Sequence, residues 1–262
     1  MVFEKVTENV FAMVGSPAYA NVTAIILPER VVMVDSGIQL TSVIETRKEL
    51  EDFSGRRIEI VILTHFHSDH TRALPAFSNC RIISSKLLLK NLKQAGRKTP
   101  RGFQHTFPNE TFEDQLEIQD GDIQLIIKRT GGHTDGSTYV YCPDYRVVVA
   151  GDNLWIKYNP WGGARNGDPD VWIQTLKEYL SLDAVYFIPG HGPVGSKSNV
   201  VELLNYIYNV REVMREMIAS GRSEEEILKA GERVEYIPSR IAHISTMKKW
   251  FKIWKARKLA SQ

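Results

Sequence analysis

The chain has 262 residues, enough for one large domain or two small ones with a substantial hydrophobic core. Lys and Arg number 33 against 31 Asp and Glu, and this near balance argues against a general nucleic-acid binder. The start of the chain has no signal-peptide pattern, and no apolar run approaches the ~18 residues that a membrane span needs. We therefore expect a cytoplasmic protein without a membrane span. Two cysteines, Cys80 and Cys142, are too few for a disulfide framework or a thiolate zinc site, and both are expected to be inert.

The first 150 residues alternate between strand and helix patterns. Apolar, β-branched runs predict strands, and the run at 56–66 is typical of a strand buried on both faces. A helix is predicted at 40–55, with Thr41 as its N-cap and Gly55 at its end, and another at 85–94. Residues 96–115 are predicted to be a loop. The predicted strands cover 22–28, 30–37, 56–66, 81–86, 122–130, 137–142 and 146–151.

The remaining residues are mainly helical by pattern. A helix is predicted at 167–182, with Asp168 or Asp170 near its N-terminus, followed by a buried strand at 184–194. Three more helices are predicted at 198–219, 223–230 and 239–258. The last is basic and has an apolar stripe, which favours packing on the protein with solvated charges, although such a helix could also contact a membrane or a phosphate-bearing substrate. Strands interleaved with helices predict an α+β fold of two sheets covered by helices on their outer faces.

Potential metal ligands recur where the predicted strands end. His65, His67, Asp69 and His70 all lie in THFHSDH (64–70), after the strand at 56–66. His133 lies in TGGHTDGS, Asp152 in AGDNL at the end of 146–151, and His191 in PGHGP. Strand ends meet at one rim of a sheet, where binding sites are usually built. Accidental clustering does not account for five of the seven histidines at one rim.

These seven side chains exceed the ligand number of one tetrahedral ion. They suit two ions that share a bridging carboxylate and a bridging hydroxide, an arrangement that drives hydrolytic displacement. Because no thiolate takes part, the ligand set fits Zn²⁺, Mn²⁺ or Fe and does not by itself choose among them. We expect two divalent ions per chain, with Zn²⁺ as the first expectation.

The motifs, together with Asp35 in VDSG, resemble in order and spacing the metallo-β-lactamase-fold hydrolases. The resemblance covers residues 35–191 and implies an αββα sandwich of two mixed sheets flanked by helices. Together with the helical pattern from residue 198 onward, it predicts a catalytic domain at 1–197 and a helical C-terminal extension at 198–262 packed on the same domain. It also implies that one metal is held by His65, His67 and His133, a second by Asp69, His70 and His191, and that Asp152 bridges them. Asp35 would orient the site without binding metal.

Departures from the family pattern leave every ligand in place and leave the substrate open. Arg72 and Ala73 follow the first motif, and Gly131 and Asp135 flank His133 where prolines are frequent. Trp155 stands where lactonase members often have tyrosine, and GGAR (162–165) only loosely matches a glyoxalase II segment. The stretch after Asp152 most resembles members whose substrates are unassigned.

We therefore expect a dinuclear metal-dependent hydrolase that cleaves an ester, thioester, lactone or phosphoester bond in a small molecule, with Asp69 and Asp152 as catalytic residues and Asp69 as a candidate proton relay. One alternative is a mononuclear iron enzyme of the same superfamily that oxygenates persulfides. Another is a metal-binding protein without turnover. Homo-oligomers could form through the C-terminal helices, and loop position suggests that Tyr19, Trp155, Tyr158 and Trp161 line the substrate cleft.

Overall fold

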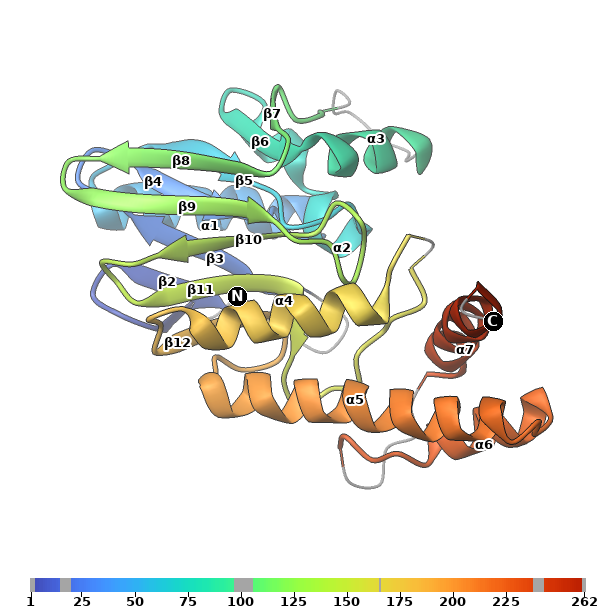
Figure 1. Ribbon diagram of the computed structural model, residues 1–262. Helices are drawn as coiled ribbons and strands as arrows, with labels where there is room; N and C mark the ends of the chain where they lie inside the picture. The colour runs from blue at the N-terminus through green and yellow to red at the C-terminus, as the bar shows by residue number, and fades with distance from the viewer. Residues whose placement is uncertain (1–2, 15–19, 97–105, 165, 238–242, 261–262) are drawn as a thin grey trace.

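The computed structural model describes the chain except for residues 1–2, 15–19, 97–105, 165, 238–242 and 261–262. Two β-sheets face one another between two layers of helices (Figure 1). This arrangement confirms the predicted α+β sandwich of two mixed sheets.

The first sheet has strands in chain order, antiparallel from β1 to β4 and parallel from β4 to β7. Its strands are β1 (Phe3–Lys5), β2 (Val10–Met13), β3 (Val22–Ile26), β4 (Val31–Val34), β5 (Ile58–Ile62), β6 (Arg81–Ser85) and β7 (Glu110–Phe112). The prediction missed β1 and β2. The predicted loop at 96–115 was wrong in part, because it contains β7 and the first residue of β8. Strands β1, β2 and β7 are three or four residues long and too short to show a period, so pairing with a neighbouring strand defines them.

The second sheet has the order β12-β11-β10-β9-β8. Its strands are β8 (Gln115–Asp120), β9 (Ile123–Arg129), β10 (Thr138–Cys142), β11 (Val147–Trp155) and β12 (Tyr186–His191). β8 also escaped prediction. Its residues alternate between polar and apolar from Gln115 to Gln119, so the signal of a strand with one buried face was present in the sequence. Only β11 and β12 run parallel, and their register shifts on either side of Gly151.

Helices α1 (Leu40–Ser54), α2 (Ser68–Thr71) and α3 (Lys86–Gln94), with a 3-10 helix at Leu74–Phe77, belong to the half of the chain that forms the first sheet. Helix α1 begins after Gln39, so the prediction of Thr41 as N-cap was wrong. It ends as predicted at Gly55, which adopts a left-handed conformation with φ 64°.

Helices α4 (Pro169–Ser181), α5 (Lys197–Ala219), α6 (Glu224–Glu232) and α7 (Ile244–Ala260) lie on the side of the second sheet (Figure 1). The Asp168 carboxylate caps α4 by accepting hydrogen bonds from the backbone N–H groups of Asp170 and Val171.

The hydrophobic core is layered because both sheets are covered. Val32, Ile60 and Ile188 belong to the cluster between the sheets, whereas Met33 and Val61 pack toward α1. Strands β4 and β5 therefore bury side chains on both faces, which explains their nearly continuous apolar sequence.

The third cluster joins the second sheet to α4–α7 and contains Phe187, Trp172 and Trp250. In α7 the predicted apolar stripe is confirmed at Met247 and Trp254, which are buried, but not at Ile244, which is 46% exposed. The domain division at residue 197 stays a prediction.

Candidate metal centre

The C-terminal end of β5 supplies four of the seven predicted ligands. His65 and His67 lie in the extended segment after the strand, and the turn of α2 then carries Asp69 and His70 back toward it. His133 follows β9, and His191 is the last residue of β12. The structure thus brings together side chains separated by up to 126 positions, from His65 to His191.

The sequence analysis placed Asp152 at the end of its strand. In the structure Asp152 lies inside β11, which continues to Trp155. The register shift between β11 and β12 and the positive φ of Gly151 (54°) bend the strand at this point. The bend lets the Asp152 side chain reach the rim while the strand continues. Gly190 on β12 lies so close to the carboxylate that a Cβ there would overlap Asp152 Oδ1.

The ligand candidates form two groups. Within each group, the nitrogen and oxygen atoms that could bind metal lie within 4.8 Å of one another. One group is His65, His67, His133 and Asp152, and the other is Asp69, His70 and His191. In the first, His67 Nδ1 lies 2.9 Å from both His65 Nε2 and His133 Nε2. In the second, His191 Nε2 lies 3.1 Å from Asp69 Oδ2.

Asp152 faces both groups with different oxygens. Its Oδ2 lies 3.3 Å from His133 Nε2 and 3.5 Å from His65 Nε2. Its Oδ1 lies 3.0 Å from His70 Nε2 and 3.5 Å from His191 Nε2. A carboxylate held this way can bind one cation with each oxygen.

Buried atoms of this cluster fit a bound cation. Among the residues that the structure describes, His70 Nε2 and Asp152 Oδ1 are buried and make no well-directed hydrogen bond, although they lie 3.0 Å apart. Such groups are rare in folded proteins unless an ion or water satisfies them. Three imidazole nitrogens also converge on one point, an arrangement that a divalent cation would stabilise. The residues therefore fit a metal on chemical grounds.

Burial and neighbouring charges keep three histidines neutral. Burial, followed by nearby histidines, lowers the pKa of His65 well below its usual value. Burial likewise lowers the pKa of His67 to about 3 and that of His133 to about 4. Neutral imidazoles have free lone pairs, so these side chains are ready to bind metal at neutral pH.

The carboxylates of the cluster remain ionised although they are buried. Burial raises the pKa of Asp152, but the surrounding histidines, His191 foremost, outweigh it and hold that pKa well below the usual value. For His70 burial lowers the pKa, and the carboxylates of Asp152 and Asp35 raise it well above the usual value. A metal ion would replace the proton that His70 Nε2 otherwise carries.

Asp35 lies directly behind the ligands and is 2% exposed. Its Oδ2 lies 2.7 Å from His70 Nδ1 and accepts a hydrogen bond from the Thr64 hydroxyl at 2.7 Å. The Oδ1 atom accepts from the Thr64 backbone N–H at 2.8 Å. Because a carboxylate only accepts, His70 Nδ1 keeps its proton toward Asp35, and Nε2 is the nitrogen that a metal ion would bind.

Three supporting residues escaped the sequence analysis. Thr64 connects Asp35 to His65 Nδ1 at 3.1 Å, and Asn153 Oδ1 accepts from the His133 backbone N–H at 2.9 Å. Asn21 donates to the carbonyls of Pro189 and Gly192, on either side of His191. Thr64 and Asn153 directly precede and follow ligand candidates in the sequence, and this position was the signal that could have identified them. No sequence signal pointed to Asn21.

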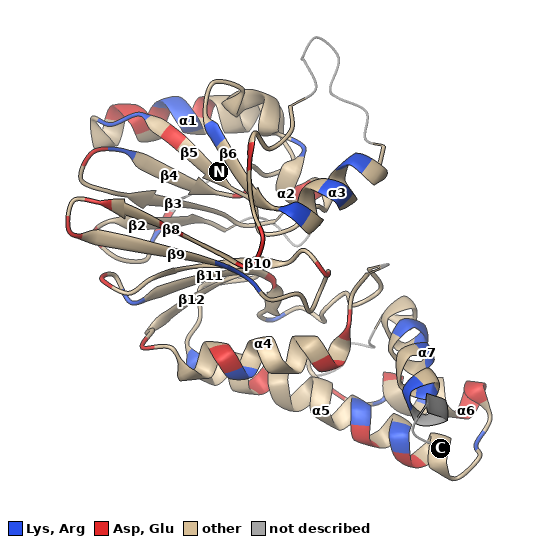
Figure 2. Cartoon of the chain, turned by 45° about the horizontal axis from the view of Figure 1, so that its top comes forward, with Lys and Arg blue, Asp and Glu red and all other residues tan. Residues whose placement is uncertain are grey.

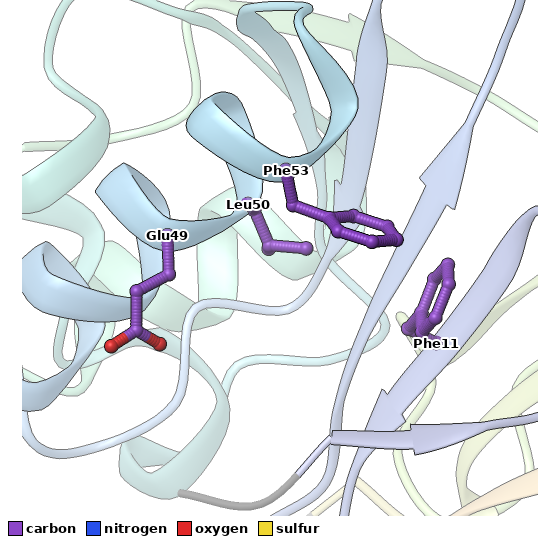
Figure 3. Close-up of a pocket in the computed structure, with 4 residues that line it drawn as sticks. All are labelled: Phe11, Glu49, Leu50 and Phe53. Atoms are coloured by element: carbon purple, nitrogen blue, oxygen red, sulfur yellow. The ribbon is translucent and has the colours of Figure 1, made fainter.

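Of the predicted cleft residues, Trp155 stacks on His191 with ring centroids 4.3 Å apart, and Trp161 lies 5.2 Å from His67. Tyr158 packs against the cluster of the second sheet, and Tyr19 lies outside the described residues. A separate apolar cavity of about 220 Å³ is lined by Phe11, Glu49, Leu50 and Phe53, none of them a ligand candidate (Figure 3).

An αββα sandwich with two His/Asp groups at one rim defines a class of metal-binding proteins. A profile of the metallo-beta-lactamase superfamily matches residues 15–191 of this sequence. The chain belongs to that superfamily, which confirms the resemblance noted in the motifs.

Individual relatives are distant. A linear primary-alkylsulfatase of a Pseudomonas species is 25% identical over 68% of this chain and 42% of its own length. A beta-lactamase-like protein 2 homolog of Caenorhabditis elegans is 25% identical over 75% of this chain and 63% of its own. The chain thus spans less than two thirds of either relative. The solved structure of a metallo-beta-lactamase from Pontibacter korlensis has the same fold, with a TM-score of 0.68, 21% identity and coverage of 79% of this chain and 99% of that one.

No helix among the described residues is long and apolar enough to cross a membrane.

Proposed function

We propose that the chain is a hydrolase that holds two divalent metal ions, most readily Zn²⁺, at the two His/Asp groups. The observation that carries the proposal is the orientation of Asp152, whose Oδ2 faces His65 and His133 while Oδ1 faces His70 and His191. A single mononuclear site would have no use for the second oxygen and the second group. Superfamily membership supports the same reading.

Two metal ions at these groups would supply the Lewis acidity that polarises a scissile carbonyl or phosphoryl bond and lowers the pKa of a water molecule. His65, His67 and His133 would hold one ion, Asp69, His70 and His191 the other, and Asp152 both. The substrate is proposed to be a small ester, thioester, lactone or phosphoester.

The surrounding residues orient these ligands and exclude solvent. Asp35 fixes the His70 tautomer, and Trp155 covers one face of the His191 ring. For Asp69 burial raises the pKa, but the hydrogen bond from His191 and the charge of His70 outweigh it and lower that pKa. Asp69 is therefore an ionised acceptor, 22% exposed, on the open side of the centre, and it is the candidate for relaying a proton to the leaving group.

The test is metal analysis of the protein purified without added metal, combined with a panel of esters, thioesters, lactones and phosphodiesters. We expect two equivalents of zinc or manganese per chain and hydrolysis of at least one class. Asp152→Ala should lose metal and activity together. His243→Ala, which removes an exposed histidine outside both groups, should retain both metal and activity.

One equivalent of iron, together with oxygen consumption on persulfides, would replace the proposal with the oxygenase alternative. Bound metal without turnover would favour a binding protein. The cytoplasmic location and oligomeric state stay predictions.

A further inference from the structure

The C-terminal extension (198–262) contacts the segment that follows Asp152 at two places beside the candidate metal centre, once from the connection between α6 and α7 and once from α7. The Tyr236 hydroxyl donates a hydrogen bond to the Trp155 carbonyl at 2.5 Å, and the Trp155 ring stacks on His191. On the other side of the centre, Trp161 Nε1 donates to Ser245 Oγ at 3.1 Å. Ser245 lies in the first turn of α7. The extension therefore reaches both groups of ligand candidates through tryptophans.

The backbone beside Trp161 lies directly against α7. The Gly162 N–H donates to the buried Thr246 hydroxyl at 2.9 Å. A Cβ at Gly162 would lie 2.7 Å from Trp250 Nε1 and 2.9 Å from Thr246 Cγ2, so any other residue would force the loop away from the helix. The glycine permits this close approach, and the approach sets where Trp161 stands.

Helix α7 is itself tied to the start of α4. The Arg257 guanidinium pairs with the carboxylates of Asp168 and Asp170, and Trp254 Nε1 donates to Asp170 Oδ1 at 3.2 Å. Figure 2 shows the basic residues of α7 and acidic residues on the neighbouring helices. The loop of Trp161 leads into α4, so α7 contacts both this loop and the start of the helix that follows it.

Trp161 and Phe66 form an aromatic rim around His67. The Trp161 ring lies 5.2 Å from that of His67 and 6.0 Å from that of His133, and the Phe66 ring lies 4.7 Å from that of His67. Both aromatic side chains are only partly buried, so apolar ring surface remains exposed next to the proposed reaction centre. Such a surface favours contact with hydrocarbon over contact with a charged group.

We propose that Trp161 is a specificity-determining residue that packs against the acyl chain of the substrate, and that Ser245 is a positioning residue that holds the Trp161 ring in place. The inference rests on the proposed hydrolase function and narrows its substrate class to esters or thioesters with an aliphatic acyl group that is long enough to reach the aromatic rim. A substrate whose acyl part is short or charged gains nothing from the aromatic rim.

The test compares Trp161→Ala, Trp161→Phe and Ser245→Ala with the control Ser220→Ala, whose hydroxyl donates only to Glu216 O within its own helix region. Kinetics on p-nitrophenyl butanoate and octanoate give the chain-length preference. Each fully buried methylene contributes up to about a fourfold factor, and one ring covers only part of the chain. We therefore expect Trp161→Ala to lower the octanoate-to-butanoate ratio of kcat/KM roughly tenfold, mainly through KM. Trp161→Phe, which keeps a ring but lacks the Nε1 donor, and Ser245→Ala should each lower it roughly threefold.

Binding provides a readout independent of turnover. Calorimetric titration with octanoate and butanoate, of protein with and without added zinc, should show weaker octanoate binding in the Trp161 and Ser245 variants and unchanged butanoate binding. An unchanged chain-length preference in Trp161→Ala, in both assays, would overturn the role of Trp161. An unchanged preference in Ser245→Ala would overturn its positioning role. If the wild type hydrolyses neither ester, the proposed function fails for these substrates, and the octanoate titration still decides the role of the aromatic rim.

Discussion

Replacing Asp35 with asparagine tests how the candidate metal centre is oriented. Asp35→Asn keeps the size of the side chain but turns one of two accepting oxygens into a donor. In the wild type, Asp35 Oδ2 lies 2.7 Å from His70 Nδ1. If the asparagine oxygen still accepts the hydrogen bond from the Thr64 backbone N–H, the asparagine amide nitrogen takes the place of Oδ2 and must donate to His70 Nδ1. The His70 proton would then move to Nε2, the nitrogen that faces Asp152.

The expected cost follows from these contacts. Loss of a residue that orients a metal-binding histidine reduces metal affinity by about 10–100-fold, which corresponds to about 1.4–2.7 kcal/mol. The second group should be affected more, because His70 belongs to it, whereas His65 feels Asp35 only through Thr64. The metal-free protein should also lose about 1.5–3 kcal/mol of unfolding free energy, the contribution of a hydrogen bond to a charged group.

The assay is competition for zinc against a chromophoric chelator, together with urea unfolding of the metal-free protein. Asp120→Asn is the matched control, because Asp120 is also a buried aspartate (3% exposed) that accepts from a backbone N–H and from Arg30. It should lose stability without losing zinc affinity. Wild-type affinity for both equivalents of zinc in Asp35→Asn would refute the orienting role.

Two further predictions concern the core and the thiols. Phe187→Ala removes a fully buried ring between the second sheet and its helices. Urea titrations should show that the unfolding free energy falls by about 3–5 kcal/mol, and the metal content should be unchanged. A loss below about 1 kcal/mol would contradict the described packing. Burial raises the pKa of Cys142 to about 11 and also raises that of Cys80, so only ~10⁻³ of Cys142 is thiolate at pH 8. Mass spectrometry should find neither thiol alkylated by iodoacetamide in the folded protein and both alkylated in urea, and rapid labelling of the folded chain would show that they are not inert.

The candidate ligands could be found from the sequence because their signals are local. THFHSDH, GGHTDGS and PGHGP each place a histidine beside a strand whose apolar run is visible without the fold. Strands β4 and β5 were equally clear, since burial on both faces leaves a nearly continuous apolar run, interrupted only by Glu59 in β5.

Short elements and cap positions could not be predicted in the same way. Strands β1, β2 and β7 exist through hydrogen bonds to neighbours rather than through their own pattern. Thr41 has the right chemistry for an N-cap, but α1 begins earlier, where Leu40 can reach the core.

The sequence by itself determined which side chains could bind metal and that they would gather at one rim, because ligand chemistry and strand ends are properties of short segments. Only the tertiary structure decided how they face one another. The bend that aims Asp152 at both groups needs the β11–β12 pairing, and the Asp35–His70 contact joins residues 35 positions apart. The placement of Trp161 by Ser245 spans 84 positions. Contacts at such separations form only once the chain has packed its sheets and helices together, and a local pattern therefore carries no record of them.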